Sequence, residues 1–265
     1  MTELIAPLGK NHPQRRELVQ IKVCWDSAKR LFQIIVKRPF DFESGQIWKI
    51  PLSKGVTSME AFITQIQQTS MVEWLGAATG LIGVTLSIKE KVLAWPFFII
   101  CYGLYAYLSY SVSLYAAMSL NVCFIPFSLY GWWKWGMASR GKNKDHSSSE
   151  SLAIAQLTAR QRIAVCGIGL LATIGIGTVL SRFTEGAFPY LDAFATSISF
   201  LAQWMLSRKY IENWIAWFVA DAAFIVLWAM QGYWVAVGMF IVFTVLAALG
   251  FSSWRKELSK RGSQV

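Results

Sequence analysis

Seven long apolar segments follow one another between residues 72 and 254 of the chain. Each has about the length that a helix needs to cross a bilayer, roughly 20 residues. Lipid offers no partner to bare backbone groups, so segments that span it are either helices or strands of a closed barrel. These segments lack strand-like alternation, so the pattern predicts an all-α integral membrane protein with seven transmembrane helices. The expected helices are residues 72–89, 91–110, 112–137, 163–182, 188–207, 211–231 and 233–254.

One polar stretch, residues 1–71, precedes the apolar segments, and another, residues 138–162, divides them. Residues 1–71 hold ten Lys and Arg and no apolar run long enough to span. Within them, residues 19–36 read first as a strand and then as an amphipathic helix, which predicts either a membrane-surface segment or a small extension packed on the loops. The predicted divisions are an N-terminal extension (1–71), a first three-helix group (72–137), a polar loop (138–162), a linker helix (163–187), a second three-helix group (188–254) and a basic tail (255–265).

The composition agrees with a membrane protein. Of the 265 residues, 55% are hydrophobic and 15% are charged, and the mean hydropathy is +0.42. Soluble domains carry about 25% charged residues, so these values argue against an ordinary soluble enzyme and exclude a disordered chain. Lys and Arg exceed Asp and Glu by 25 to 15. The basic residues lie between apolar runs or in the tails and not on a recognition motif, so we expect no nucleic-acid partner.

Reactive side chains are few and scattered. No two cysteines form a CxxC pair, and the two histidines, His12 and His146, lie in polar segments. A metal site needs a cluster of such ligands, and acid–base catalysis needs a group placed beside its target. The sequence therefore predicts no metal, no cofactor and no catalytic residue.

An internal repeat relates the two three-helix groups. Residues 73–135 align with residues 192–254 at a constant offset of 119, without a gap, and the breaks between spans coincide. Identical residues occur at Trp95 and Trp214, Leu108 and Leu227, Ala117 and Ala236, Phe124 and Phe243, Gly131 and Gly250, and Trp135 and Trp254.

Three spans reverse the direction of the chain, and the single span at residues 163–182 restores it. The predicted architecture is therefore three plus one plus three, with two parallel three-helix repeats about an axis along the membrane normal. Transporters use such repeats and bind their substrates near the midplane between them.

Loop charge predicts the orientation. One side carries Lys89, Lys91, Arg208 and Lys209 together with the basic residues of the 138–162 loop and of the C-terminal tail, and the other side has Arg182 and Lys54. The basic side is expected to be cytoplasmic. We therefore expect a cytoplasmic C-terminus. Tryptophans near span ends predict an interfacial aromatic belt. They are Trp74, Trp132, Trp133, Trp135, Trp234 and Trp254.

Polar and aromatic side chains recur at helical spacing inside several spans. Trp214, Trp217 and Asp221 share one stripe of the sixth span, and Asn213 lies on a neighbouring stripe. Repeat symmetry would turn the matching stripe of the second span toward them. The candidate substrate-binding residues are Gln203, Asn213, Trp214, Trp217, Asp221, Trp95, Phe98, Tyr102, Tyr105, Asn121 and Ser199.

These side chains suit a flat, cationic ligand. Aromatic rings stack on a planar ring and attract a cation. Asn and Gln offer donors and acceptors to an amide or to sugar hydroxyls, and a carboxylate balances a positive charge. Structural alternatives stay open. The aromatic residues could be packing, Asp221 could bond the aligned Tyr102, and Gln203 could bond a neighbouring helix.

Several motifs resemble the PnuC nicotinamide riboside transporters, a family related to the SWEET sugar transporters. They are EWLGAATGLIGVTLSIKEKVLAWPF, YGLYAYLSYSVSLYA, YGWWKW and AQWMLSRKYIENWIAWFVAD, and the match suggests a Neisseria-type member. The resemblance covers residues 73–256. It implies facilitated uptake of nicotinamide riboside across a bacterial inner membrane, trapping by a cytoplasmic kinase, and a homotrimer. It also implies binding roles for Gln203, Asn213, Trp214 and Trp217. Asn121 departs from the Gln expected there.

Rival functions remain at this stage. One is a transporter of another flat ring, such as thiamin or a deoxynucleoside. An intramembrane enzyme would need a polar catalytic cluster, and Asp221 stands without a histidine. A receptor or assembly subunit would bind without flux.

Overall fold

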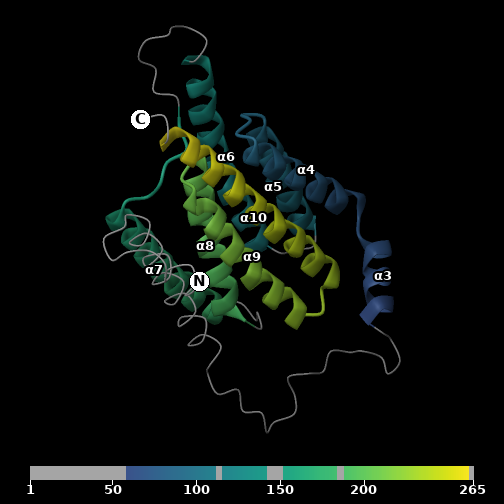
Figure 1. Ribbon diagram of the computed structural model, residues 1–265. Helices are drawn as coiled ribbons and strands as arrows, with labels where there is room; N and C mark the ends of the chain where they lie inside the picture. The colour runs from purple at the N-terminus through teal and green to yellow at the C-terminus, as the bar shows by residue number, and fades with distance from the viewer. Residues whose placement is uncertain (1–57, 112–114, 142–151, 184–187, 263–265) are drawn as a thin grey trace, which may run out of the picture. The chain divides into compact units, whose positions relative to one another are not determined.

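The computed structural model describes residues 58–111, 115–141, 152–183 and 188–262, and these fold almost entirely into helices (Figure 1). Eight helices lie in the described ranges. They are α3 (Ser58–Gln68), α4 (Met71–Ile88), α5 (Ala94–Ser111), α6 (Tyr115–Gly141), α7 (Ala159–Phe183), α8 (Pro189–Ser207), α9 (Glu212–Met230) and α10 (Trp234–Gly262).

The seven expected spans coincide with α4 to α10. Differences are confined to the ends: α6 continues to Gly141, α7 begins at Ala159, and α10 continues eight residues past the predicted end, to Gly262. Four of these helices, α4, α7, α9 and α10, are long and apolar enough to cross a membrane. The all-helical fold is therefore confirmed, with these four helices as candidate membrane spans.

Local sequence signals explain several helix boundaries. At the start of α4, the Glu73 backbone N–H donates to Ser70 Oγ at 3.2 Å, and the Ser70 N–H donates to Glu73 Oε2 at 2.6 Å. This capping box satisfies two backbone donors that a helix start leaves open. Helix α8 begins with Pro189, whose fixed φ suits a first helical position.

The helix α3 lies in the predicted N-terminal extension, residues 1–71, in a part for which no helix was predicted. Its Gln65 side chain donates from Nε2 to the Gly232 carbonyl at 2.8 Å and accepts the Val235 N–H at 3.3 Å. The α3 helix is thereby attached to the turn before α10. The segment 19–36 lies outside the described residues.

The two three-helix groups make equivalent contacts. Helices α4, α5 and α6 pack in sequence order, as do α8, α9 and α10, and the groups meet where α6 packs on α8 and α10 packs on α4. Trp135 Nε1 donates to the Ser207 carbonyl, and Trp254 Nε1 donates to the Ile88 carbonyl, both at 3.1 Å. Ser207 and Ile88 differ by the repeat offset of 119, so the two bonds are the same interaction made in both directions.

One ion pair joins equivalent positions of the two groups. Lys209 Nζ lies 2.7 Å from Glu90 Oε2, and their numbers again differ by 119. Both residues have positive φ, 54° for Glu90 and 56° for Lys209, so both helix-to-helix turns bend in the same way. These contacts bring the α4–α5 and α8–α9 turns to one end of the helices.

Four tryptophans connect the two groups at that end. The ring centroids of Trp95 and Trp135 are 5.3 Å apart and those of Trp214 and Trp254 are 5.4 Å apart, each pair nearly perpendicular, and Trp135 and Trp254 meet at 6.4 Å. Trp135 and Trp254 are only 1% exposed. Their assignment to the aromatic belt was wrong, because each side chain fills the core and donates to the opposite group.

Part of the predicted 138–162 loop is an ordered strap, residues 152–158. Ala155 bridges to the α8–α9 turn: its N–H donates to the Lys209 carbonyl, and its carbonyl accepts the Ile211 N–H, both at 3.0 Å. Ile154 and Leu157 on either side are 4% exposed. The strap thus adds apolar side chains to the core of the second group.

Candidate functional site

Helix α8 contributes most of the buried polar side chains. It packs against α6, α7 and α9, which explains why most of its residues are hidden. Thr196, Ser199 and Gln203 are all buried, and Gln203 is 0% exposed. The spacing of these residues therefore carries a polar stripe into the interior.

Two buried amides have carbonyl oxygens without a hydrogen-bond partner among the described residues. Gln203 donates from Nε2 to Ser128 Oγ on α6 at 3.2 Å, and its Oε1 is unpaired. Asn213 donates from Nδ2 to the Tyr210 carbonyl at 2.6 Å, and its Oδ1 is unpaired. An unsatisfied buried acceptor costs about 1–3 kcal/mol. Donors on a bound molecule, such as amide N–H or hydroxyl groups, would satisfy both oxygens.

Aromatic side chains from the two groups share one apolar cluster. Trp95, Phe98 and Trp214 are core members, and Tyr102 and Trp217 pack against it. The indole N–H groups of Trp95 and Trp214 are buried without an acceptor in the described part of the chain. The structure thus brings Trp95, Phe98 and Tyr102 of one predicted stripe together with Trp214 and Trp217 of the other.

The two tryptophans lie nearer one end of the helices than expected. Trp95 is the second residue of α5 and Trp214 the third of α9, so both belong to first turns. At 1.5 Å per residue, Gln203 and Trp217 each lie roughly 6–8 Å from that end, and Asp221 lies about 13 Å from it, near mid-length. A ligand that touched all of them would extend from the midplane toward the tryptophan core.

Asp221 is a buried carboxylate, 4% exposed. The alternative that it bonds Tyr102 is wrong, because among the described residues neither side chain donates to or accepts from the other. Tyr102 instead stacks on Phe124, with ring centroids 4.8 Å apart. Asp221 is the only Asp, Glu, Lys or Arg among the buried residues of the described ranges.

Comparison with known proteins places these residues in a family. A family model described as nicotinamide mononucleotide transporter matches residues 70–256, which include every site residue above. The chain belongs to this family. The match confirms the resemblance drawn from the sequence motifs and makes the chain a member of a membrane transporter family.

The chain is similar to several transporters of known name. The nicotinamide riboside transporter PnuC of Neisseria mucosa is 28% identical over 239 residues, covering 82% of this chain and 88% of the relative. Its counterpart in Escherichia coli K12 is 25% identical over 214 residues, covering 74% and 89%. The riboflavin/roseoflavin transporter RibM of Streptomyces davaonensis is 22% identical over 196 residues, covering 74% and 89%.

A solved structure shares the fold of this chain. The crystal structure of the vitamin B3 transporter PnuC superposes with a TM-score of 0.58 at 24% identity, covering 77% of this chain and 90% of that one.

Three predicted site residues make their contacts with α4 or within their own helices. Tyr105 lies against α4, where a Cβ on Gly76 would be 3.1 Å from its ring. Asn121 Nδ2 donates to the Ala117 carbonyl at 2.9 Å, and Ser199 Oγ to the Ala195 carbonyl at 2.8 Å, each within its own helix. The structure therefore joins Tyr105 to the α4–α5 interface and not to the cluster.

Sequence reasoning missed Ser128, Phe124 and Phe200 as neighbours of the site. Ser128 Oγ accepts a hydrogen bond from the Gln203 side-chain amide. Phe124 lies between Tyr102 and Phe200, and the ring centroids of Phe124 and Phe200 are 4.6 Å apart. Phe124 carried one signal, its identity with Phe243 in the repeat. Ser128 carried none, because a serine in an apolar span most often bonds its own helix.

Proposed function

We propose that this chain mediates facilitated uptake of nicotinamide riboside by alternating access. One observation carries the proposal: two buried side-chain carbonyl oxygens, on Gln203 and Asn213, receive no hydrogen bond from the residues that the structure describes, and they lie in a chain whose two helical groups both build an aromatic cluster. The names of the PnuC relatives support the same substrate.

The chemistry of nicotinamide riboside fits these groups. Its pyridinium is flat and positive, so it stacks on aromatic rings and is attracted by their faces. Its carboxamide NH₂ and ribose hydroxyls are donors that suit Gln203 Oε1 and Asn213 Oδ1. Asp221, buried at mid-length of α9, places a carboxyl group in the same interior, which a cationic ligand would favour in its ionised form.

The lack of a buried basic side chain in the described part of the chain favours the riboside over the mononucleotide. Among the buried residues of the described ranges there is no Lys or Arg. A phosphate group carries about two negative charges and is bound in proteins mainly by such side chains. A mononucleotide would bring these charges into an interior that already holds the Asp221 carboxylate.

The proposed architecture is three plus one plus three, as in PnuC and SWEET proteins. Two parallel repeats, α4–α6 and α8–α10, are linked by α7 and related by an axis along the membrane normal. The reciprocal tryptophan bonds and the matched positive φ angles support this reading. Substrate exchange would then rock one repeat against the other around the site.

No coupling ion is needed for uptake of a cation. A membrane potential that is negative inside favours its entry by about 2.3 kcal/mol per 100 mV for full charge transfer. We assign no catalytic role to any residue. The chain would act in the bacterial inner membrane with its C-terminus in the cytoplasm, where a kinase would trap the product, and would assemble as a homotrimer, as the family resemblance implies.

Uptake by purified protein in liposomes tests the substrate. We expect saturable uptake of labelled nicotinamide riboside that an excess of unlabelled riboside suppresses. Nicotinamide mononucleotide, thiamin, a deoxynucleoside and riboflavin should each compete less well. Stronger competition by any one of these compounds would transfer the proposal to that substrate, and binding without flux would indicate a receptor.

A further inference from the structure

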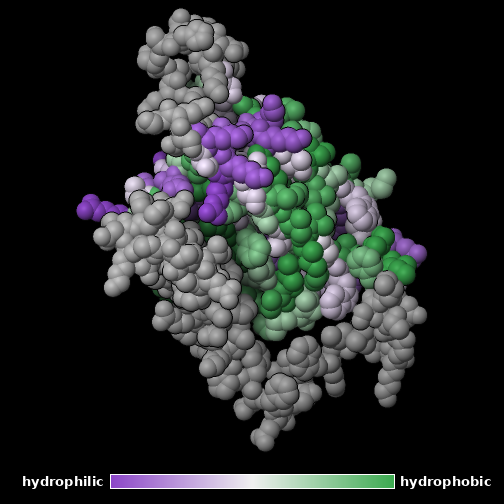
Figure 2. All heavy atoms as spheres, in the orientation of Figure 1, coloured by the Kyte–Doolittle hydropathy of each residue, from purple (hydrophilic) through white to green (hydrophobic). Residues whose placement is uncertain are grey.

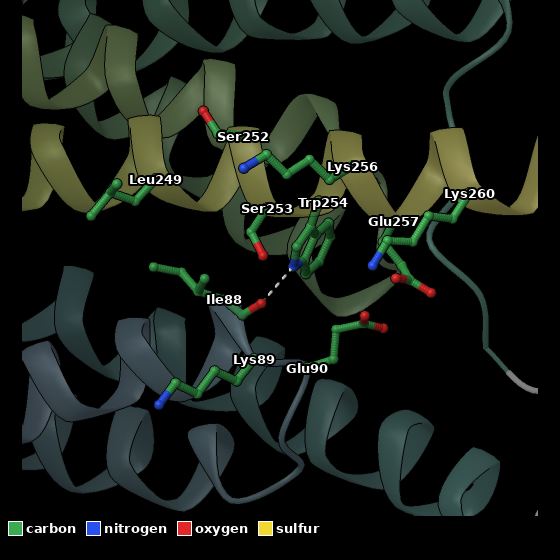
Figure 3. Close-up of a pocket in the computed structure, with 10 residues that line it drawn as sticks. All are labelled: Ile88, Lys89, Glu90, Leu249, Ser252, Ser253, Trp254, Lys256, Glu257 and Lys260. Atoms are coloured by element: carbon green, nitrogen blue, oxygen red, sulfur yellow. Dashed lines mark hydrogen bonds between the residues drawn. The ribbon is translucent and has the colours of Figure 1, made fainter.

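A pocket of about 410 Å³ lies outside the candidate substrate site, between the C-terminal end of α4 and the second half of α10 (Figure 3). Trp254 forms its inner wall and is fixed there by the bond from its Nε1 to the Ile88 carbonyl. The pocket therefore stands on the rigid tryptophan core, and its rim is built from polar side chains.

The rim carries an excess of positive charge, three lysines against two glutamates. Lys89, Lys256 and Lys260 line the pocket, and none of them forms a salt bridge within the described residues. Two glutamates also line it, but the Glu90 carboxylate is engaged by Lys209 at 2.7 Å. The hydroxyls of Ser252 and Ser253 lie on the same rim. Ammonium and hydroxyl groups together are donors suited to a phosphate.

The rim lies at the depth of lipid headgroups. Helix α10 is apolar for 18 residues, from Trp234 to Phe251, which at 1.5 Å per residue spans about 27 Å of hydrocarbon. The lining residues of α10 begin around the end of this run, and Lys89 follows the last residue of α4. Figure 2 shows hydrophilic atoms gathered over the C-terminal part of α10 and an apolar surface below them.

An apolar stripe leads along α10 to the pocket. Ile241, Val245 and Leu249 are about half exposed, at 49%, 54% and 56%, and follow one another at a spacing of four residues. Ser252 and Lys256 continue the same helix face toward the rim. An acyl chain lying on this stripe would bring its headgroup to the lysines.

We propose that this pocket binds the phosphate of an anionic phospholipid headgroup, with the acyl chain along the exposed stripe of α10. The proposal is independent of which substrate the protein carries. A soluble phosphate compound would share the headgroup chemistry but would make no use of the apolar stripe.

Native mass spectrometry of the full chain in detergent, with phosphatidylglycerol or phosphatidylcholine added, tests the site. The variant K89Q/K256Q removes two lining charges. The matched control is K91Q/R255Q. Lys91 lies in the same turn as Lys89 and Arg255 lies on the same helix as Lys256, but neither residue lines the pocket. We expect a preference for phosphatidylglycerol that falls about fivefold per lysine removed in the first variant and persists in the control.

Three results would overturn the proposal. The first is unchanged phosphatidylglycerol binding in K89Q/K256Q, and the second is an equal loss of binding in K89Q/K256Q and K91Q/R255Q. The third is a loss of lipid binding when inorganic phosphate is added, with no preference between the two lipids. The last would assign the pocket to a soluble phosphate. The variant K89R/K256R keeps the charges and should keep the preference, so its loss also contradicts the assignment. Gel filtration of each variant checks the fold.

Discussion

At the residue scale, the tryptophans of the core depend on two glycines. A Cβ on Gly131 would lie 2.3 Å from the Trp95 ring, and one on Gly250 would lie 2.6 Å from the Trp214 ring. Because the four residues are identical pairs in the repeat, the sequence could indicate their equivalence. It could not indicate that each glycine faces a tryptophan, because that contact depends on how neighbouring helices cross.

Gly131→Ala should destabilise the protein by about 1–3 kcal/mol, since the added methyl overlaps the Trp95 ring. Thermal unfolding of the purified protein measures this. Gly136→Ala on the same helix is the control, because nothing lies within 4 Å of its added Cβ. Equal melting temperatures for the two variants would show that the contact is not tight.

The unpaired amide oxygens make a second prediction at this scale. Asn213→Ala and Trp217→Ala should abolish high-affinity binding of nicotinamide riboside, because they remove an acceptor and a ring from the site. Isothermal titration calorimetry measures the affinity. Thr173→Ala also removes a buried polar group, one that bonds its own helix at the Gly169 carbonyl, and should bind normally. Unchanged affinity in both site variants would contradict the proposed pocket.

At the element scale, the apolar runs were sufficient to predict seven helices because burial in lipid imposes length and continuity on each one. The strap at residues 152–158 was not predicted. It was assigned to the polar 138–162 loop because its run of Leu and Ile is too short to predict an element, and its order comes from distant partners. Glu212 accepts the Leu157 N–H at 3.1 Å with both carboxylate oxygens and pairs with Arg162 at 2.9 Å.

Arg162→Gln and Glu212→Gln should loosen this strap. Glu212→Gln should cost about 1–2 kcal/mol, because it removes a charged acceptor that is only partly exposed. Limited proteolysis between α6 and α7 should become several-fold faster in both variants. Arg160→Gln, two residues away and exposed, should leave the rate unchanged. Equal cleavage in all three variants would mean that these bonds do not hold the strap.

At the scale of the whole molecule, the constant offset of 119 predicted that the two groups are equivalent. It could not show how they meet. That arrangement rests on Trp135, Trp254 and the Lys209–Glu90 pair, whose partners are far apart in sequence. The sequence pattern placed most of the candidate side chains in the interior, as the structure has them, but not their depth, and their role in binding stays a prediction. Depth depends on where each helix begins.

Reversing one charge of the Lys209–Glu90 pair should weaken the contact between the groups. Lys209→Glu or Glu90→Lys alone places like charges opposite each other and should cost about 1–2 kcal/mol. The double exchange K209E/E90K should recover most of the lost thermal stability. A double variant no more stable than the single ones would indicate that the pair does not join the two groups.

The central claim is that the two groups carry a flat cation between them, and flux under a membrane potential tests it most directly. Purified protein in liposomes with an imposed potential, negative inside, should take up labelled nicotinamide riboside faster than at zero potential. Asn213→Ala should abolish that uptake. Uptake no greater than in protein-free vesicles, or equal in the wild type and Asn213→Ala, would contradict the account.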